Sequence, residues 1–138
     1  MKTFLRIIQL SAIAFLLTLG LPSCRAWRIK KDYQRLVGSW KEEWGAQDVQ
    51  YQDVYQIAYT NANRLIITCQ SRPHYIVSGV NYDGKVLRLQ LEIRDNKYNT
   101  GSALVQYELK FVANPPTLIG TALNHEQKAI PVKWIKQQ

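Results

Sequence analysis

The residues capable of reaction chemistry are few and scattered along this 138-residue chain. The two histidines, His74 and His125, stand in turn-like stretches without a second metal ligand at the usual spacing. A zinc site needs three or four converging ligands, and a nucleophile needs a neighbouring base. Neither pattern is visible, and the chain has no nucleophile elbow or glycine-rich phosphate loop. We therefore expect no enzyme activity, no metal site and no cofactor.

Two tyrosines have the spacing of ligand-orienting groups. Tyr55 and Tyr59 flank Ile57, and alternate residues of a strand share one face. Their hydroxyls would orient a ligand in an otherwise apolar pocket. The alternative is that both are core tyrosines whose hydroxyls reach the rim of the fold.

Glu42 is an acidic residue in an apolar pattern, because it alternates onto the same face as Trp40 and Trp44. A buried carboxylate would need a partner. The residue marks either a binding mouth or a strand that is bulged or emerging into solvent, and we favour the second interpretation. The nearby acids are expected to be solvated: Asp32, Glu43, Asp48 and Asp53.

The elements that carry these residues have the period-two pattern of β-strands. Eight stretches rich in β-branched and aromatic residues follow one another: Val37–Trp44, Gln52–Tyr59, Arg64–Gln70, His74–Val80, Lys85–Arg94, Ala103–Val112, Thr117–Leu123 and Ile130–Lys136. The side chains expected to face inward are bulky and apolar: Leu87, Leu89, Leu91, Ile93, Val105, Tyr107, Leu109, Phe111, Val132 and Trp134. Cys69 ends an apolar run and is expected to be buried and inert.

The connections between these stretches are too short for a crossover helix. The sequence therefore predicts an all-β fold, an eight-stranded antiparallel up-and-down barrel over residues 37–138, with a two-sheet sandwich as the rival. Closure into a barrel would remove exposed sheet edges. A barrel of eight strands is just wide enough to be filled by side chains or to hold one small ligand.

The segment Gly38-Ser39-Trp40, which follows a short helical turn, resembles the G-x-W motif that opens lipocalins and related calycin barrels. The resemblance implies that Trp40 closes one end of the barrel and that Lys133 or Lys136 packs over it. It also implies a small apolar or amphipathic ligand. The candidate ligand-binding residues are Trp40, Glu42, Tyr55, Tyr59, Tyr107 and Trp134.

A second resemblance concerns Ser78-Gly79-Val80-Asn81-Tyr82, which is similar to the S-G-x-x-Y motif of the lipoprotein inhibitors of C-type lysozyme. That resemblance implies an inhibitory loop formed by Ser78 and Tyr82, with Lys97 as the nearest lysine. The alternative function is therefore a filled barrel that acts as a protein-interaction module or as a lysozyme-type hydrolase inhibitor.

The N-terminal segment has the pattern of an export signal. Lys2 and Arg6 precede 15 uncharged residues, Ile7–Leu21. This is shorter than the ~20 apolar residues of a membrane-spanning helix and matches a secretory signal peptide. Leu21-Pro22-Ser23-Cys24 then resembles the lipobox of bacterial lipoproteins. The resemblance implies a signal peptide over residues 1–23 and acyl chains on Cys24, followed by a tether and helical turn over residues 24–36.

The charge of the chain bears on its partners. Lys2 and Arg6 are two of the 18 basic residues, and all 10 acidic residues follow Cys24, so residues 25–138 carry a net charge of +6. Export would exclude nucleic acid as a partner. The expected partners are a lipid bilayer through acylated Cys24, a small apolar ligand and an envelope protein. Arg25 stands where an aspartate would signal inner-membrane retention, which favours the outer membrane of the cell envelope.

Overall fold

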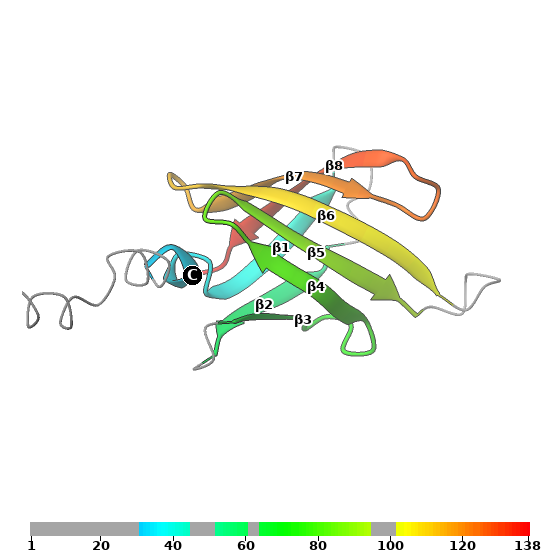
Figure 1. Ribbon diagram of the computed structural model, residues 1–138, viewed down its shortest axis with the longest axis horizontal. Coiled ribbons are helices and arrows are strands. Elements are labelled where there is room, and N and C mark those ends of the chain that lie inside the picture. Colours follow the sequence, from blue (N-terminus) through cyan, green and yellow to red (C-terminus); the bar gives the residue numbers. More distant parts are fainter. Residues whose placement is uncertain (1–30, 45–51, 61–63, 95–101) are drawn as a thin grey trace, which may run out of the picture. The chain divides into compact units, whose positions relative to one another are not determined.

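The computed structural model describes residues 31–44, 52–60, 64–94 and 102–138. A short helical turn at residues 31–34 precedes eight strands (Figure 1). The strands are β1 (Gly38–Trp44), β2 (Val54–Tyr59), β3 (Leu65–Cys69), β4 (Ile76–Tyr82), β5 (Val86–Ile93), β6 (Ala103–Val112), β7 (Thr117–Leu123) and β8 (Ala129–Lys136). Each lies within two residues, at either end, of the stretch expected from period-two alternation.

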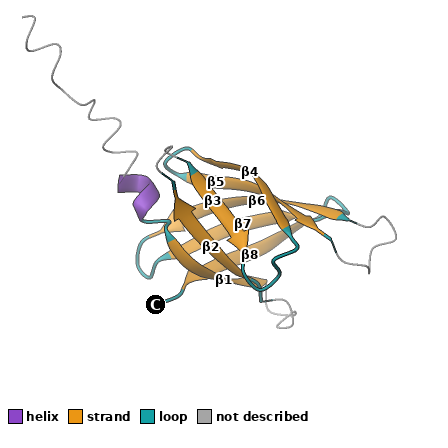
Figure 2. Ribbon diagram, turned by 90° about the horizontal axis from the view of Figure 1, so that it is seen from below, coloured by secondary structure: helices purple, strands orange, loops and turns teal. Residues whose placement is uncertain are grey.

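The strands form one antiparallel sheet in the order β3-β2-β1-β8-β7-β6-β5-β4. β1 pairs with both β2 and β8, so the first and last strands are neighbours and the sheet curls into a nearly closed barrel (Figure 2). The expected up-and-down barrel is confirmed. Among the described residues, no ladder joins β3 to β4. We refer to this unpaired junction as the seam.

The barrel is held together by the inward faces of its strands. On β6, buried and exposed residues alternate over eight positions, and β5 has the same alternation. Leu87, Leu89, Leu91 and Leu109 are at most 2% exposed, as expected from the pattern. Burial of apolar surface contributes roughly 25 cal/mol per Å², so these rows of leucine are a main source of stability.

The fourth strand is the one whose position the sequence misplaces most. The sequence predicts a strand over residues 74–80 and a turn from Asn81, whereas β4 runs to Tyr82. The register against β5 shifts between Ser78 and Asn81, at a β-bulge that contains Gly79. The bulge inserts an extra residue and lets the strand continue. Tyr82 consequently faces the core and is 5% exposed.

Candidate functional site

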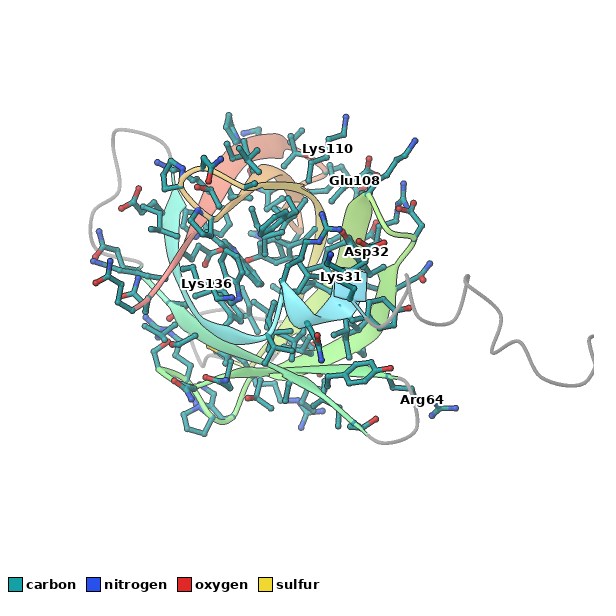
Figure 3. The ribbon with its side chains drawn as sticks, turned by 90° about the vertical axis from the view of Figure 1, so that its left-hand side faces the viewer. Lys31, Asp32, Arg64, Glu108, Lys110 and Lys136 are labelled. Carbon is teal, nitrogen blue, oxygen red and sulfur yellow. The ribbon has the colours of Figure 1, made fainter. Side chains whose placement is uncertain are left out.

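The end of the barrel beside the helical turn is closed by Trp40. Its indole is fully buried, and Nε1 donates a hydrogen bond to the Leu36 carbonyl oxygen at 2.7 Å. Lys136 places Nζ 5.5 Å from the Trp40 ring centroid and donates a hydrogen bond to the Arg35 carbonyl oxygen at 3.1 Å. Figure 3 looks onto this end and labels Lys136. The expected packing of a lysine over Trp40 is therefore confirmed; Lys136 rather than Lys133 provides it, as a cation–π contact.

Gly38 permits this closure. Its backbone has φ of 134°, which favours glycine, and a Cβ atom would lie 2.9 Å from Cε of Lys136. The glycine of the G-x-W segment thus leaves room for the lysine that covers the tryptophan.

A second feature lies inside the barrel, where four side chains from four strands meet. We call Glu42 (β1), Tyr55 (β2), Tyr107 (β6) and Trp134 (β8) the polar cluster. Trp134 Nε1 donates a hydrogen bond to Glu42 Oε1 at 3.1 Å, and the Tyr55 hydroxyl donates one to Oε2 at 3.5 Å. All four residues are at most 3% exposed. The carboxyl group is therefore enclosed by protein and held from two sides.

Aromatic rings form the walls of the polar cluster. The Tyr55 ring stacks on the Trp134 ring, with centroids 4.2 Å apart and planes inclined by 6°. Tyr107 meets Trp134 edge-on, with centroids 5.7 Å apart. Such aromatic pairs contribute about 0.5–1.5 kcal/mol beyond the area they bury. The rings are thus held in fixed positions around the carboxyl group.

The hydroxyl group of Tyr107 is buried without a hydrogen-bond partner among the described residues. A hydrogen-bonding interaction with this hydroxyl lowers the pKa of the Glu42 carboxyl, but the two groups do not reach the distance and angle of a regular hydrogen bond. Burial raises the pKa of both Tyr107 and Tyr55 well above the usual value, so both hydroxyls keep their protons. An unsatisfied buried hydroxyl is uncommon and calls for a missing partner, such as water or a ligand.

Burial also raises the pKa of the Glu42 carboxyl, to about 7. Hydrogen bonding from Trp44 and Trp134 opposes this rise, and the charge of Asp53 adds to it. None of the ion pairs between described residues involves Glu42. The group therefore sits near its titration midpoint at neutral pH, without a neighbouring cation from the described part of the chain.

These positions correct two expectations. Glu42 does not emerge into solvent, because the strand stays regular in its pairing with β8 through Trp44 and Glu42 is 1% exposed. Asp53 is not solvated either, since it is 9% exposed. Its Oδ1 accepts hydrogen bonds from Ser71 Oγ at 2.8 Å and from Arg72 Nε at 2.9 Å. This network ties the start of β2 to the turn between β3 and β4.

The structure brings four of the six candidate ligand-binding residues together and places the other two elsewhere. Trp40 belongs to the closed end described above. Tyr59 packs against Tyr33 of the helical turn, with ring centroids 5.5 Å apart. Alternation in the sequence shows which face of a strand a residue occupies, but not how far along the barrel axis it lies. It therefore could not separate these two residues from the cluster.

The residues of the second resemblance are spread over β4. Ser78 is exposed, whereas the Tyr82 hydroxyl donates a hydrogen bond to the Gly84 carbonyl oxygen at 3.0 Å. Lys97 and Cys24 lie outside the described residues. Cys69 is buried and has a free thiol, as expected, with Sγ 3.5 Å from Ser71 Oγ.

The described residues contain no group of three or more potential metal ligands. None of the described helices has the length and apolar character needed to cross a membrane.

Comparison of the chain with protein-family models, with curated proteins and with solved structures gives no match. The likeness to calycin barrels rests on the nearly closed eight-stranded antiparallel sheet itself.

Proposed function

We propose that this chain is a membrane-anchored lipoprotein of the bacterial cell envelope whose lipocalin-like barrel binds one small amphipathic molecule. The binding site is the polar cluster. Ligand pockets are mostly apolar with a few polar groups that fix orientation, and the cluster has this composition. The anchor is Cys24, and the outer membrane is the favoured location.

The observation that carries the proposal is the unpartnered, buried hydroxyl of Tyr107. A barrel selected only for packing would place phenylalanine at this position, since a buried hydroxyl without a partner destabilises the fold by about 1–3 kcal/mol. A ligand with a hydrogen-bonding group would satisfy Tyr107 and Glu42 together, while its apolar part packs on the aromatic rings.

Native mass spectrometry of the full-length protein, extracted from its own membrane, tests ligand binding. We expect an added mass that is retained on gentle extraction and reduced in the Tyr107→Phe variant. The matched control is Tyr59→Phe, which removes a hydroxyl beside the helical turn, outside the polar cluster, and should leave the added mass in place. A protein that carries no added mass, in any extraction, would refute the binding function.

The anchor is tested separately by metabolic labelling with an alkyne fatty acid and by membrane fractionation. We expect label and membrane association in the wild type and loss of both in Cys24→Ser. The control is Cys69→Ser, which alters the buried thiol of β3 and should keep the label. Equal labelling of the wild type and Cys24→Ser would refute lipidation at this cysteine.

The alternative function is a filled barrel that acts through its outer surface, on an envelope protein or on a lysozyme-type hydrolase. It is favoured by the complete burial of Trp40, Tyr55 and Trp134, which occupy much of a narrow interior. Crosslinking in cells and a lysozyme inhibition assay test it. A specific crosslinked partner, together with no added mass by native mass spectrometry, would favour this function over ligand binding.

A further inference from the structure

The acidic residue of the polar cluster lacks the partner that a buried carboxylate ordinarily has. Buried charges in proteins are paired or coordinate metals, because removing them from water is unfavourable. Glu42 is 1% exposed, and the groups that hydrogen-bond to it from the described residues are the indole N–H groups of Trp134 and Trp44 and the Tyr55 hydroxyl. All are neutral donors. The negative charge is therefore uncompensated within the described part of the chain.

The hydrogen-bonding capacity of the cluster is also only partly used. A carboxylate can accept about four hydrogen bonds. Glu42 accepts two from this cluster and one from Trp44, and the one from Tyr55 is long, at 3.5 Å. The Tyr107 hydroxyl adds one free donor and further acceptor capacity. The cluster thus offers more acceptors than donors, and a ligand that fits it must itself be rich in N–H or O–H donors.

The walls of the cluster favour a positive charge. Tryptophan and tyrosine rings attract cations over their faces, most strongly where water is excluded. The Tyr55 and Trp134 rings stack on one another, Tyr107 meets Trp134 edge-on, and Tyr55 and Trp134 contact the carboxyl group. A carboxylate and three electron-rich rings together make a site for a cation that can donate hydrogen bonds.

We propose that the polar cluster binds the protonated amine of the ligand, with the ammonium group donating hydrogen bonds to Glu42 and to the Tyr107 hydroxyl oxygen. This inference rests on the proposed function and adds the chemical class of the ligand to it. The alkyl or aryl part of the amine packs against the aromatic rings and the leucine rows of the barrel.

The net charge of the chain helps to distinguish amine selectivity at the polar cluster from a general electrostatic attraction to the protein surface. Residues 25–138 have a net charge of +6 and would attract anions at the protein surface. A preference for amines over acids would therefore have to arise locally, at the buried carboxylate. Neutral alcohols of the same length report on the apolar contribution alone.

Isothermal titration calorimetry tests the inference on the full-length protein in phosphatidylcholine nanodiscs, with empty nanodiscs as the blank. The probes are hexylamine, hexan-1-ol and hexanoic acid, and the decyl compounds serve as a longer series. At pH 8 we expect the amines to bind at least about tenfold more tightly than the alcohols, since a charged hydrogen bond is about 1.4 kcal/mol or more stronger than none. The acids should bind most weakly.

Variants separate the cluster from the rest of the barrel. Glu42→Gln keeps the size of the side chain and removes the charge, so the preference for amine over alcohol should fall to about one. Glu43→Gln is the matched control, because the neighbouring residue is not part of the cluster. Tyr107→Phe should weaken amine binding several-fold and alcohol binding less. Far-ultraviolet circular dichroism of each variant confirms that the barrel is intact.

The pH dependence of amine affinity also tests the role of Glu42. If Glu42 had only a structural role, amine affinity would not follow the ionisation of its carboxyl group. The groups that face its carboxyl are Asp53, whose charge opposes ionisation, and Tyr55, Tyr107, Trp44 and Trp134. Burial raises the pKa of Glu42 to about 7. Amine affinity should therefore rise by more than about tenfold from pH 5 to pH 8, because one pH unit below the pKa reduces the ionised fraction about tenfold. Alcohol affinity should not rise.

The possible outcomes distinguish the inference from the function on which it rests. If alcohols or acids bind as tightly as amines, or if the amine preference survives in Glu42→Gln, the amine assignment is wrong and the binding function stands. If none of the six probes binds and native mass spectrometry finds no added mass, the binding function itself is wrong.

Discussion

Glu42 occupies a position at which a barrel interior ordinarily has an apolar side chain. The fold tolerates its carboxyl there because Trp134 and Tyr55 donate hydrogen bonds to it. Burial nevertheless raises the pKa of this carboxyl to about 7. A carboxyl whose pKa is higher in the folded than in the unfolded state stabilises the fold only while it is protonated. The residue thus links the stability of the barrel to pH.

We expect the wild type to lose stability as pH rises from 5 to 8. The unfolded pKa is 4.5 and the folded pKa is about 7, so folding binds a proton in this window and the fold is weakened as that proton leaves. At about 1.4 kcal/mol per pKa unit, the loss is roughly 3 kcal/mol in the free energy of unfolding. Chemical denaturation at a series of pH values measures it.

The Glu42→Gln variant is the control for this prediction, because glutamine does not titrate. Its unfolding free energy should change by less than about 1 kcal/mol over the window in which the wild type loses roughly 3 kcal/mol. Parallel pH profiles for the two proteins would show that Glu42 ionises in the folded state as easily as in water.

Lys136 helps to close the end of the interior beside the helical turn through two contacts, with the Trp40 ring and with the Arg35 carbonyl oxygen. Lys136→Met keeps the aliphatic chain and removes both contacts, so we expect a loss of about 1–2 kcal/mol in the free energy of unfolding. Lys133→Met, at an exposed position of the same strand, should change stability by less than about 0.5 kcal/mol. Urea unfolding compares the two, and equal losses would show that the Trp40 contact contributes nothing.

At the scale of the strands, period-two alternation predicted the fold because each strand has one face toward the core. The inward row on β5 and β6 could be read from the sequence before any pairing was known. The polar cluster could not be predicted in the same way. Glu42 is 13 positions from Tyr55 and 92 from Trp134, and only the closure of the barrel brings them together. An isolated acid in an alternating pattern is therefore ambiguous until its partners are located.

The close approach of β6 and β7 depends on Gly120. An added Cβ would lie 1.8 Å from the Glu108 carbonyl oxygen and 2.9 Å from its carbonyl carbon. Backbone atoms cannot move away as a flexible side chain can, so Gly120→Ala requires the two strands to separate. We expect a loss of roughly 3–5 kcal/mol, in the largest class of single-residue effects.

Thermal unfolding measures the effect of Gly120→Ala, with Thr121→Ala as the matched control at the next, exposed position of β7. The control should shift stability by less than about 0.5 kcal/mol. If Gly120→Ala lowers stability no more than Thr121→Ala does, the two strands do not approach as closely as described.

At the scale of the whole molecule, the barrel differs from a fully closed one at the seam. β3 is paired only with β2, and β4 only with β5, among the described residues. A cleft of about 370 Å³ lies there, lined by residues of the helical turn, β3 and β4: Tyr33, Arg64, Leu65, Gly79, Val80, Asn81 and Tyr82. The seam is thus the part of the wall where packing rather than a hydrogen-bonded ladder holds two strands together.

Local opening should consequently begin at the seam. Amides of β3 and β4 that point toward it have no ladder partner there, and regions with fewer protected hydrogen bonds open at a lower free energy than the core of a sheet. Hydrogen–deuterium exchange followed by mass spectrometry should show peptides from β3 and β4 exchanging before those from β7 and β8, which have neighbours on both sides. A ligand at the polar cluster contacts β1, β2, β6 and β8 and should slow exchange there while leaving β4 fast. Uniform exchange around the barrel would show that the seam is as firmly closed as the ladders.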